Sequence, residues 1–493
     1  MKRNPSELAN KTFDLAIVGG GILGAGIARD AALRGLSVAL VEKGDFASGT
    51  SSRSTKLVHG GLRYLEHLSL GLVAESCRER GILLDMAPHL VKPLSFLLPA
   101  YDGDRRSLGM LRLGTTIYDW LTPRRHSATP RHRTLSADEA IADEPSLPRE
   151  HLQGAVLFYD CQMDDARLCL ETVLDACRHG AACVNYCEVT GFRRTRDRVE
   201  ALQVVDQVTG ESFDVKAKCF VNATGPWVER VGRLASRDSS PISLNPTKGV
   251  HLVVPRINQK HGIYFQSKRD RRMIFLLPWG DDSLLGTTDT QFTQPVDAVS
   301  TDASDVAYLL GQLRELAPSR AITARDIITT FAGVRALIRS DQRRPSRRSR
   351  EERIVVSCEN CLTVAGGKYT TFRAISEKVV RRVYRILGRK PAKCRTSVTP
   401  LPNQQFAASG IQIAASPKVH ESDIILACTS EMAIMLEDVM RRRTQLALSR
   451  HGGIEVATQI SHLMANQLDW DETTRSNQLD EYLDMRAGPT ANG

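Results

Sequence analysis

The stretch of sequence that decides the fold is FDLAIVGGGILGAGIARDAALRGLSVALV, which covers residues 13–41. Its first apolar run, Phe13–Val18, meets a cluster of glycines. A helical pattern of small residues follows over Ala25–Leu36, and a second apolar run covers Val38–Val41. Strand, glycine turn, helix and strand in this order predict the βαβ unit that opens a parallel sheet.

Three glycines in this unit indicate what it binds. Gly19, Gly21 and Gly24 form GxGxxG between the first strand and the helix. The first glycine allows the tight turn, the second lets backbone approach a pyrophosphate, and the third permits close helix packing. Glu42 ends the second strand, where a carboxylate can accept hydrogen bonds from a ribose diol. We therefore predict a dinucleotide site. The alternative is a glycine-rich turn beside a surface glutamate.

Two later segments favour FAD over NAD, since both cofactors share this fingerprint. Ala223, Thr224 and Gly225 in VNATGPW follow one apolar run, and Gly366 and Gly367 in AGGKYTT follow another. Two further backbone turns can therefore approach one long, extended cofactor. FAD suits this arrangement better than NAD.

Length and composition limit the class of protein. A chain of 493 residues is too long for one ordinary core, so we expect at least two domains. Hydrophobic residues make up 42% and charged residues 25%, which disfavours disordered, collagen-like and disulfide-scaffold proteins. The net charge of +10 indicates anionic partners: phosphorylated substrates, nucleic acid or an acidic membrane surface.

The cysteines and the apolar runs indicate the compartment. Eleven scattered cysteines are typical of reduced thiols, and we expect no metal site. Zinc or redox chemistry at Cys358 and Cys361, with Cys183 and Cys187 as a second pair, is the alternative. Met1–Phe13 lacks the apolar core of a signal peptide, and no apolar stretch is long enough to cross a bilayer. We expect a chain that is neither secreted nor membrane-spanning.

The remaining pattern predicts three domains in an α/β fold. Apolar runs that end at glycine, such as Cys219–Val221, suggest that a Rossmann-like FAD-binding domain is assembled from distant segments. A hairpin signal over Met273–Pro278 and Ser283–Thr288 indicates an inserted antiparallel-sheet substrate domain, and a helical pattern follows Pro400. The predicted boundaries are 11–92, 155–230 and 352–390 for FAD binding, 93–154 and 231–351 for the substrate cap, and 395–493 for the C-terminal helical domain.

Six segments carry a family resemblance: GGGILGAG from Gly19, TSSRSTKLVHGGLRYLE from Thr50, VNATGPWV from Val221, GTTD from Gly286, GVRAL from Gly333 and GGKYTTFR from Gly366. In this order they resemble the FAD-dependent, quinone-linked glycerol-3-phosphate dehydrogenases. The resemblance covers nearly the whole chain, and the block from Thr50 is its most specific part. Without a calcium loop or a transit peptide, the chain is most similar to the bacterial form.

The resemblance implies roles for five residues. Oxidising a secondary alcohol at flavin needs a base for the hydroxyl proton and cations for a dianionic phosphate. Arg63 and Tyr64 would hold the phosphate, Arg335 and Lys368 would stabilise an alkoxide or the reduced flavin's negative charge, and His251 would act as general base. The alternatives are a solvated arginine, a plain helix-start lysine and a satisfied core histidine.

Two further substrate contacts and the cofactor residues are implied in the same way. Thr288 resembles a substrate-contacting position, although it can equally be a turn threonine bonded to its own backbone. Arg350 matches an arginine at the substrate entrance, with Arg347 and Arg348 as alternatives. The implied cofactor-binding residues are Gly19, Gly21, Gly24, Glu42, Ser51, Ser52, Lys56, His59, Gly60, Gly61, Ala223, Thr224, Gly225, Trp227, Gly333, Gly366, Gly367, Lys368, Thr370 and Thr371.

We therefore expect an enzyme that oxidises sn-glycerol 3-phosphate to dihydroxyacetone phosphate and passes electrons from FAD to membrane quinone. It would lie in the cytoplasm, attached peripherally to the inner face of the cell membrane. Basic stretches at Lys268–Arg272 and Arg343–Arg350 suggest contact with an anionic lipid surface, with a solvated face as the alternative. Neither stretch carries interleaved aromatics, so we expect no nucleic-acid partner.

Two other functions stay open. The same fold could return electrons to oxygen, as a glycerol-3-phosphate oxidase or a related amine or amino-acid oxidase. A flavin-binding or NAD-sensing regulator without turnover is disfavoured by Arg63 and Arg335, which a sensor would not require. The sequence does not set the oligomeric state, and a homodimer is one option.

Overall fold

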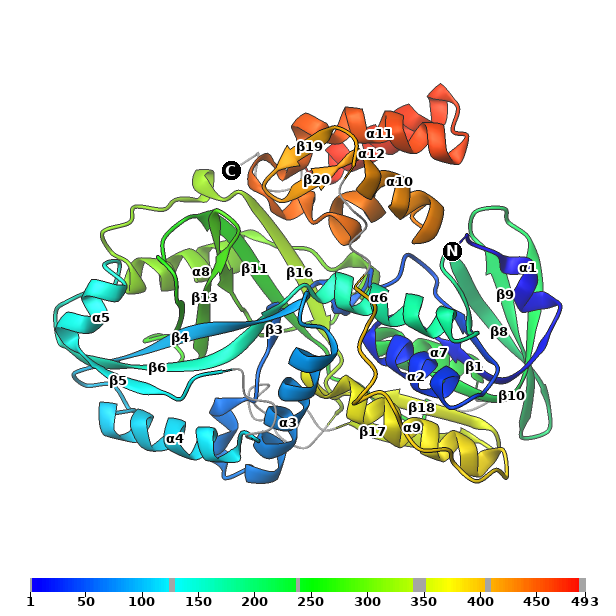
Figure 1. Cartoon of the computed structure of the whole chain (residues 1–493), viewed down its shortest axis with the longest axis horizontal. Helices are drawn as coiled ribbons and strands as arrows, with labels where there is room; N and C mark the ends of the chain where they lie inside the picture. The colour runs from blue at the N-terminus through cyan, green and yellow to red at the C-terminus, as the bar shows by residue number, and fades with distance from the viewer. Residues whose placement is uncertain (1, 124–128, 236–239, 340–351, 404–408, 487–493) are drawn as a thin grey trace.

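The computed structural model describes residues 2–123, 129–235, 240–339, 352–403 and 409–486. Figure 1 shows two sheet-containing bodies side by side, with the C-terminal helices above the region where they meet. The body on the right holds a largely parallel sheet, and the body on the left holds a largely antiparallel one. The predicted fold class is confirmed.

The parallel sheet contains the predicted βαβ unit. Its strand order is β17-β18-β10-β1-β2-β7, and β1 pairs in parallel with both β10 and β2. Every residue of β1 except Thr12 is buried, as expected for a strand covered on both faces. The antiparallel pair β8 and β9 continues the sheet from β10. The strands are β1 (Thr12–Val18), β2 (Val38–Val41), β7 (Ala182–Val184), β8 (Cys187–Thr195), β9 (Arg198–Asp206), β10 (Ser212–Asn222), β17 (Arg353–Cys358) and β18 (Cys361–Ala365).

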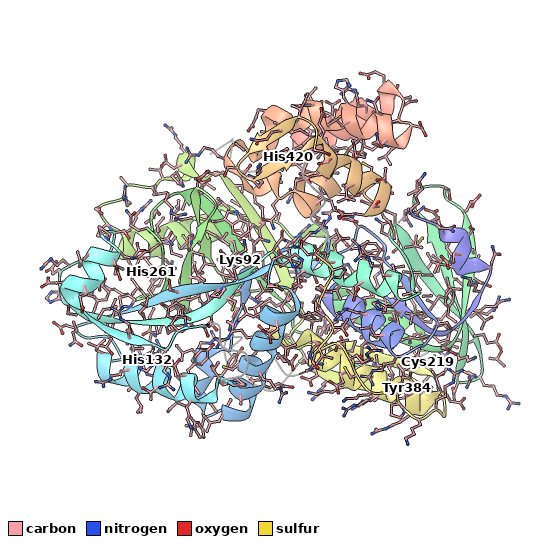
Figure 2. The ribbon with its side chains drawn as sticks, in the orientation of Figure 1. Lys92, His132, Cys219, His261, Tyr384 and His420 are labelled. Carbon is pink, nitrogen blue, oxygen red and sulfur yellow. The ribbon has the colours of Figure 1, made fainter. Side chains whose placement is uncertain are left out.

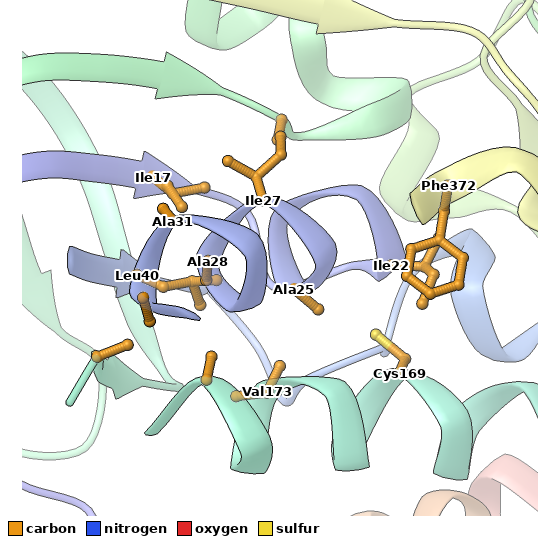
Figure 3. Close-up of a cluster of buried hydrophobic side chains, with 14 of the residues drawn as sticks. Ile17, Ile22, Ala25, Ile27, Ala28, Ala31, Leu40, Cys169, Val173 and Phe372 are labelled. Atoms are coloured by element: carbon orange, nitrogen blue, oxygen red, sulfur yellow. The ribbon is translucent and has the colours of Figure 1, made fainter. Parts of the chain in front are cut away.

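Small residues let the helices pack closely against this sheet. Figure 3 shows Ala25 and Ala28 of α2 on the side that faces Val173 of α6. A Cβ atom on Gly26 would lie 2.8 Å from the ring of Phe372, so α2 and α9 approach at the distance that glycine allows. This packing fixes the start of α2, and with it the glycine turn. The helices are α2 (Ile22–Leu33), α6 (Asp165–Arg178) and α9 (Phe372–Ile386).

The second sheet has ten strands, and the predicted hairpin lies within it. β13 and β14 pair antiparallel on either side of the turn at Gly280 and Asp281. The main strand order is β15-β11-β14-β13-β12-β4-β6-β3, with β16 paired to β11 and β5 paired to β6. The strands are β3 (Leu57–Val58), β4 (Val91–Tyr101), β5 (Arg133–Ser136), β6 (Leu152–Met163), β11 (Thr247–Pro255), β12 (Gly262–Gln266), β13 (Met273–Trp279), β14 (Asp282–Gly286), β15 (Thr290–Gln291) and β16 (Thr329–Arg335).

The predicted domain boundaries need correction where the chain crosses between the sheets. β6 is one continuous strand of the second sheet, so the boundary at 155 falls inside it. β3 lies within the predicted 11–92 segment but pairs with β6. An apolar strand pattern does not show which sheet a strand joins, and both errors follow from that. The division into three domains otherwise stays a prediction.

The C-terminal segment is helical, as predicted, with two additions. β19 and β20 form a small hairpin, and a π-helical turn, η9 (Asp438–Arg443), carries the three consecutive arginines. The elements are β19 (Gln412–Ala415), β20 (Lys418–His420), α10 (Glu421–Ser430), α11 (Ile454–Leu468) and α12 (Glu472–Arg486). The other helices are α1 (Pro5–Ala9), η1 (Thr50–Ser52), η2 (Leu62–His67), α3 (Leu70–Met86), α4 (Leu108–Leu121), α5 (Ala137–Asp143), η4 (Gly225–Trp227), α7 (Val228–Ala235), η5 (Val296–Ala298), α8 (Ala303–Leu316), η6 (Ala324–Asp326), η8 (Tyr369–Thr371), η10 (Leu446–Leu448) and η11 (Arg450–Gly453).

Two further observations concern spans and metals. None of the helices described here combines the length and apolar character needed to cross a membrane. Within the same residues, no three His, Cys, Asp or Glu side chains form a group that could hold a metal ion. Figure 2 shows His132 and His261 at different places in the body on the left, and His420 among the C-terminal elements at the top. Cys358 faces Cys361 across the β17–β18 hairpin, and both are free thiols.

Candidate active site

A cavity of about 400 Å³ brings together most of the predicted site residues, a volume typical of ligand pockets. It lies where the glycine turns after β1, β10 and β18 meet the second sheet. The predicted residues that line it are Gly19, Gly21, Glu42, Ser51, His59, Gly61, Arg63, Tyr64, Ala223, Thr224, Gly225, Trp227, His251, Gly333, Arg335, Gly366, Gly367, Lys368 and Thr370.

The glycine turn leaves its backbone exposed to this cavity. Gly19 has φ +105°, in the region that favours glycine, and a Cβ on it would lie 2.9 Å from the carbonyl oxygen of Ala223. A Cβ on Gly24 would lie 1.8 Å from the carbonyl oxygen of Gly19, so only glycine fits there. Ser51 Oγ accepts a 2.9 Å hydrogen bond from the backbone N–H of Ile22 in the first turn of α2. The start of α2 can therefore approach a pyrophosphate closely.

Glu42 is held in place at the end of β2. Its Oε2 accepts a 2.6 Å hydrogen bond from the backbone N–H of Gly20, and its Oε1 accepts one of 3.0 Å from Gly44. Burial raises the pKa of Glu42, although these two backbone bonds act in the opposite direction. The carboxyl group lines the cavity beside the glycine turn, where a ribose diol would lie.

His251 stands on β11 in a largely apolar part of the cavity wall. Its ring stacks on Phe331, with 4.8 Å between ring centroids, and its Nε2 lies 3.0 Å from Thr55 Oγ1. Nδ1 is buried and has no hydrogen-bond partner among the described residues. Burial lowers the pKa of His251 well below its ordinary value, and the positive charges of Arg335 and Lys56 lower it further. The imidazole is therefore neutral and can accept a proton.

This pKa shift leads to a testable prediction. In the FAD-loaded protein without substrate, the His251 imidazole should remain neutral as the pH falls through 6.5, because its pKa is lowered. NMR of ring-labelled histidine would follow the titration, with the His251 signal assigned by its absence from His251→Gln. Titration of this signal near pH 6.5 would contradict the buried, cation-flanked environment.

Arg335 ends β16 and is bound by the GTTD turn. Its Nη1 donates to the carbonyl oxygen of Thr288 at 3.1 Å and to Asp289 Oδ1 at 2.9 Å, and its Nη2 donates to Thr287 Oγ1 at 3.1 Å. These bonds come from one turn and fix the plane of the guanidinium group. The group also lines the cavity, close enough to His251 to affect its pKa.

Lys368 and Arg63 both lie near the aromatic ring of Tyr64. The Lys368 ammonium is 3.9 Å from the ring centroid of Tyr64 and 3.2 Å from Ser76 Oγ. The Arg63 guanidinium is 5.7 Å from the same centroid. Burial would lower the pKa of Arg63, but interactions with Tyr264, Tyr64 and Asp289 outweigh it, so the pKa is raised. Cationic groups of three side chains, counting Arg335, thus line one cavity.

The comparisons with known proteins agree with this site. Residues 14–372 match the family model described as FAD dependent oxidoreductase. A glycerol-3-phosphate dehydrogenase from Synechocystis sp. is 32% identical over 97% of each chain. The chain belongs to the FAD-dependent glycerol-3-phosphate dehydrogenase family. Residues 376–475 of this family member match the model of the C-terminal domain of alpha-glycerophosphate oxidase.

Other members of the family and its structural neighbours extend the comparison. The aerobic glycerol-3-phosphate dehydrogenase of Staphylococcus aureus is 39% identical over 79% of this chain and 71% of its own length. The glycerol-3-phosphate dehydrogenase of Bacillus halodurans complexed with FAD superposes with a TM-score of 0.77 at 27% identity, covering 98% of this chain and 96% of that one. The L-alpha-glycerophosphate oxidase of Mycoplasma pneumoniae, at 18% identity and a TM-score of 0.62, shares the fold.

FAD is the cofactor of the family, and the residues present fit it. The backbone approach at Gly19 and Gly21 can take the pyrophosphate, and Glu42 can take a ribose diol. The turn at Gly366 and Gly367, which follows β18 and directly precedes Lys368, also lines the cavity. FAD held at these turns would supply the acceptor for a hydride from the substrate.

Several predicted cofactor residues do not line the cavity. Lys56 is buried, and its ammonium pairs with Asp165 at 2.5 Å and donates to the carbonyl oxygen of Ser52 at 3.1 Å. Lys56 therefore ties its own segment to α6 rather than facing a ligand. The backbone N–H of Gly60 donates to Tyr118 Oη at 2.7 Å, which places Gly60 behind the wall. The predicted residues outside the cavity lining are Gly24, Ser52, Lys56, Gly60 and Thr371.

Thr288 also needs correction, and Arg350 has no described position. Thr288 Oγ1 accepts a 3.0 Å hydrogen bond from the backbone N–H of Val250, and the side chain is buried away from the cavity. Thr287 lines the cavity instead. Arg350, with the Arg343–Arg350 stretch, lies outside the described residues.

The sequence interpretation missed other lining residues. Arg53 lies within the Thr50 block, and its guanidinium is buried, which together with the charge of Arg441 lowers its pKa to about 10. Tyr264 and Phe275 stack with 4.3 Å between ring centroids and also line the cavity. Arg53 could have been found from its motif. The aromatic pair could not, since it depends on the register between β12 and β13.

Proposed function

We propose that this chain oxidises sn-glycerol 3-phosphate to dihydroxyacetone phosphate with FAD as hydride acceptor. The observation that carries the proposal is that Arg63, Arg335 and Lys368 line the same cavity as His251, a buried histidine whose pKa is lowered. Cations suit a substrate phosphate, and a neutral imidazole suits removal of a hydroxyl proton. FAD, when bound, supplies the two-electron acceptor for the hydride that leaves carbon.

Different residues of the chain bind the phosphate, remove the proton and stabilise the developing negative charge. Arg63, with Tyr64 beside it, binds the phosphate and so orients the other end of the substrate. His251 takes the proton of the secondary hydroxyl, while the Thr55 hydroxyl holds the imidazole at Nε2. Arg335 and Lys368 stabilise the negative charge that develops as the proton leaves. A dianionic substrate would also offset the cations that lower the pKa of His251, making it a better base when substrate is bound.

Anaerobic reduction of the flavin tests this function. Purified FAD-loaded protein should be yellow and should bleach when glycerol 3-phosphate is added without oxygen. Glycerol, which lacks the phosphate, should bleach it far more slowly at the same concentration. No bleaching by glycerol 3-phosphate would overturn the proposal. Stoichiometric peroxide formation in air would favour the oxidase instead of a quinone-linked dehydrogenase.

We further propose that the electron acceptor is a membrane quinone and that the chain binds the cytoplasmic leaflet peripherally. Support comes from a stripe of exposed apolar side chains on α4: Met110 is 56% exposed, Leu113 62% and Trp120 83%. Their spacing of three and seven residues puts them on one helical face. The opposite face, with Tyr118, is buried against the second sheet.

Neighbouring elements connect this stripe to the cavity. Leu68, 82% exposed, directly follows η2, the segment that carries Arg63 and Tyr64, and η2 packs against α4. Arg106, just before α4, pairs with Glu66 of η2 and contacts Met273, which lines the cavity. Met273 follows the basic turn Lys268–Arg272. An apolar stripe beside basic residues suits a bilayer with anionic headgroups.

Vesicle binding gives a prediction for this surface. Trp120→Ala combined with Leu113→Ser should reduce sedimentation with anionic liposomes several-fold, because the variant loses apolar area that would enter the interface. Activity with a water-soluble dye should persist, while activity with quinone in liposomes falls. Val398→Ser, which removes an exposed apolar side chain outside the stripe, is the matched control. Unchanged binding by the double variant would refute this surface.

The oligomeric state is a separate proposal. We propose that the chain forms a homodimer, and sedimentation velocity of the lipid-free protein tests this. A single species with the mass of one chain, 54.5 kDa, would refute it.

A further inference from the structure

Asp45, a buried residue in the loop after β2, accepts hydrogen bonds from two arginines of the C-terminal domain. Asp45 follows Glu42 by three residues, and its side chain is fully buried. Arg443 donates to both of its oxygens, with Nη1 at 2.7 Å from Oδ2 and Nη2 at 2.9 Å from Oδ1. Arg442 Nε donates to Oδ2 at 2.6 Å. This fork and the additional bond fix both the position and the plane of the carboxylate.

The surrounding groups complete a buried polar network. Asn185 Nδ2 donates to Asp45 Oδ1 at 3.1 Å and to the carbonyl oxygen of Met432 at 2.8 Å. Asp438 accepts hydrogen bonds of 2.6 Å from both Arg442 Nη2 and Tyr186 Oη. Burial on its own raises the pKa of Asp45, but Arg443 and Arg442 lower it to about 2. The carboxylate is therefore charged at ordinary pH and can pair with both arginines.

The loop that Asp45 belongs to forms part of the cavity wall. Glu42, Lys43 and the segment Ser48–Ser51 all line the cavity. The residues next to Asp45 also contact the glycine turn: the backbone N–H of Ala47 donates to the carbonyl oxygen of Gly20 at 3.2 Å. A Cβ atom on Gly20 would lie 2.7 Å from the ring of Phe46. A displacement of Asp45 would therefore move the residues that face the pyrophosphate and ribose.

We propose that Arg442 and Arg443 of the C-terminal domain position this loop, so that docking of the domain sets the affinity of the protein for FAD. The C-terminal helices lie above the region where the two bodies meet (Figure 1), and η9 contacts α6 of the FAD-binding body. Its contact with Asp45 reaches a cavity-lining loop. The inference depends on FAD binding only, and it holds whichever alcohol is the substrate.

A second contact between the same two domains provides a matched control. Arg167 on α6 donates to Glu431 Oε2 at 2.8 Å; Glu431 is buried and Arg167 is partly buried. Arg167 does not line the cavity. Glu431 also contacts Arg443, whose Nε lies 3.7 Å from its carboxylate and whose Nη2 donates to its carbonyl oxygen at 2.8 Å. Loss of the Arg167–Glu431 pair still leaves the fork between Arg443 and Asp45 in place, so it should weaken docking of the domain with a smaller effect on Asp45.

The experiment measures FAD affinity, not turnover. The holoenzymes of Arg443→Met, Arg443→Lys and Arg167→Met are stripped of flavin and titrated with FAD, following quenching of flavin fluorescence. Arg443→Met should weaken binding at least about tenfold, the equivalent of about 1.4 kcal/mol. Arg443→Lys, which keeps the charge but loses the fork, should fall between Met and wild type. Arg167→Met should weaken it much less at a similar loss of thermal stability.

Reciprocity supplies a test that needs no variant. If docking strengthens FAD binding, FAD binding must strengthen docking by the same factor. Adding FAD to the stripped wild-type protein should therefore slow amide hydrogen exchange across Asp438–Arg443. Equal weakening by Arg443→Met and Arg167→Met would overturn the proposal, and so would unchanged exchange in this segment.

Discussion

Gly21→Val is expected to give a folded protein that purifies almost free of FAD. Gly21 precedes the first turn of α2 and faces the cavity, with a φ of −75° that valine also adopts. Backbone strain is therefore not the cause of the loss. A Cβ at this position already lies 3.1 Å from Ser51 Oγ, and two further methyl groups would occupy the space into which the pyrophosphate must enter. Crowding of about 1–3 kcal/mol corresponds to about 10- to 100-fold weaker binding.

The measurement is the amount of flavin released per chain on denaturation, with circular dichroism to confirm the fold. Gly71→Val is the control, because a Cβ at Gly71 meets nothing within 4 Å and the position lies outside the cavity. The control should retain its flavin. Full flavin occupancy in Gly21→Val would contradict the assignment of this turn to the cofactor.

The same turn shows which parts of the fold a sequence can predict. β1, the glycines, α2 and β2 follow one another within residues 12–41, so their pattern depends on local contacts alone. The hairpin of β13 and β14 was predictable for the same reason, since its turn residues lie between its strands. Glu42 could be placed because it follows β2 directly. In each case the signal and the structure lie within a short segment.

The errors share the opposite property. Lys56 was assigned to the cofactor, but its partner Asp165 lies 109 residues further along the chain. β6 was divided between two domains because its pairing with β4 cannot be inferred from its own residues. Contacts between residues far apart in the chain decide whether a buried cation faces a ligand or an acidic side chain. A local sequence pattern does not predict such contacts.

Thr288 illustrates a finer limit. The GTTD turn borders the cavity through Thr287, while Thr288 Oγ1 accepts a hydrogen bond from the backbone of Val250. Adjacent residues of extended chain point in opposite directions, so an uncertainty of one position exchanges the exposed and the buried side chain. The family resemblance supplied the segment, and only the structure supplied the direction of its side chains.

Arg63→Met is expected to lower kcat/KM for sn-glycerol 3-phosphate by about 30-fold to several thousand-fold. Removing one partner of a buried, hydrogen-bonded charge pair costs about 2–5 kcal/mol, because the other charge is left without compensation. Both constants should change: KM rises as phosphate binding weakens, and kcat falls because that binding energy orients the reacting carbon. Arg335→Met and Lys368→Met should instead lower mainly kcat.

Glycerol separates the phosphate role from a general effect on the cavity. It has the same secondary alcohol without the phosphate, so Arg63→Met should react with glycerol about as slowly as wild type does. Equal losses with both substrates would mean that Arg63 shapes the cavity rather than binding phosphate. If kcat and KM for glycerol 3-phosphate do not change in Arg63→Met, Arg63 does not bind the phosphate, and the phosphate-binding role passes to Arg335 or Lys368.

The ratio of kcat/KM between wild type and Arg63→Met should also depend on pH. Interactions with Tyr264, Tyr64 and Asp289 raise the pKa of Arg63 above its ordinary value, so the guanidinium stays charged throughout the working range. The substrate phosphate, in contrast, gains its second charge near pH 6. The advantage of wild type over Arg63→Met should therefore increase as pH rises through about 6 and then level off. With glycerol, which carries no group that ionises there, the ratio of the two proteins should not change with pH.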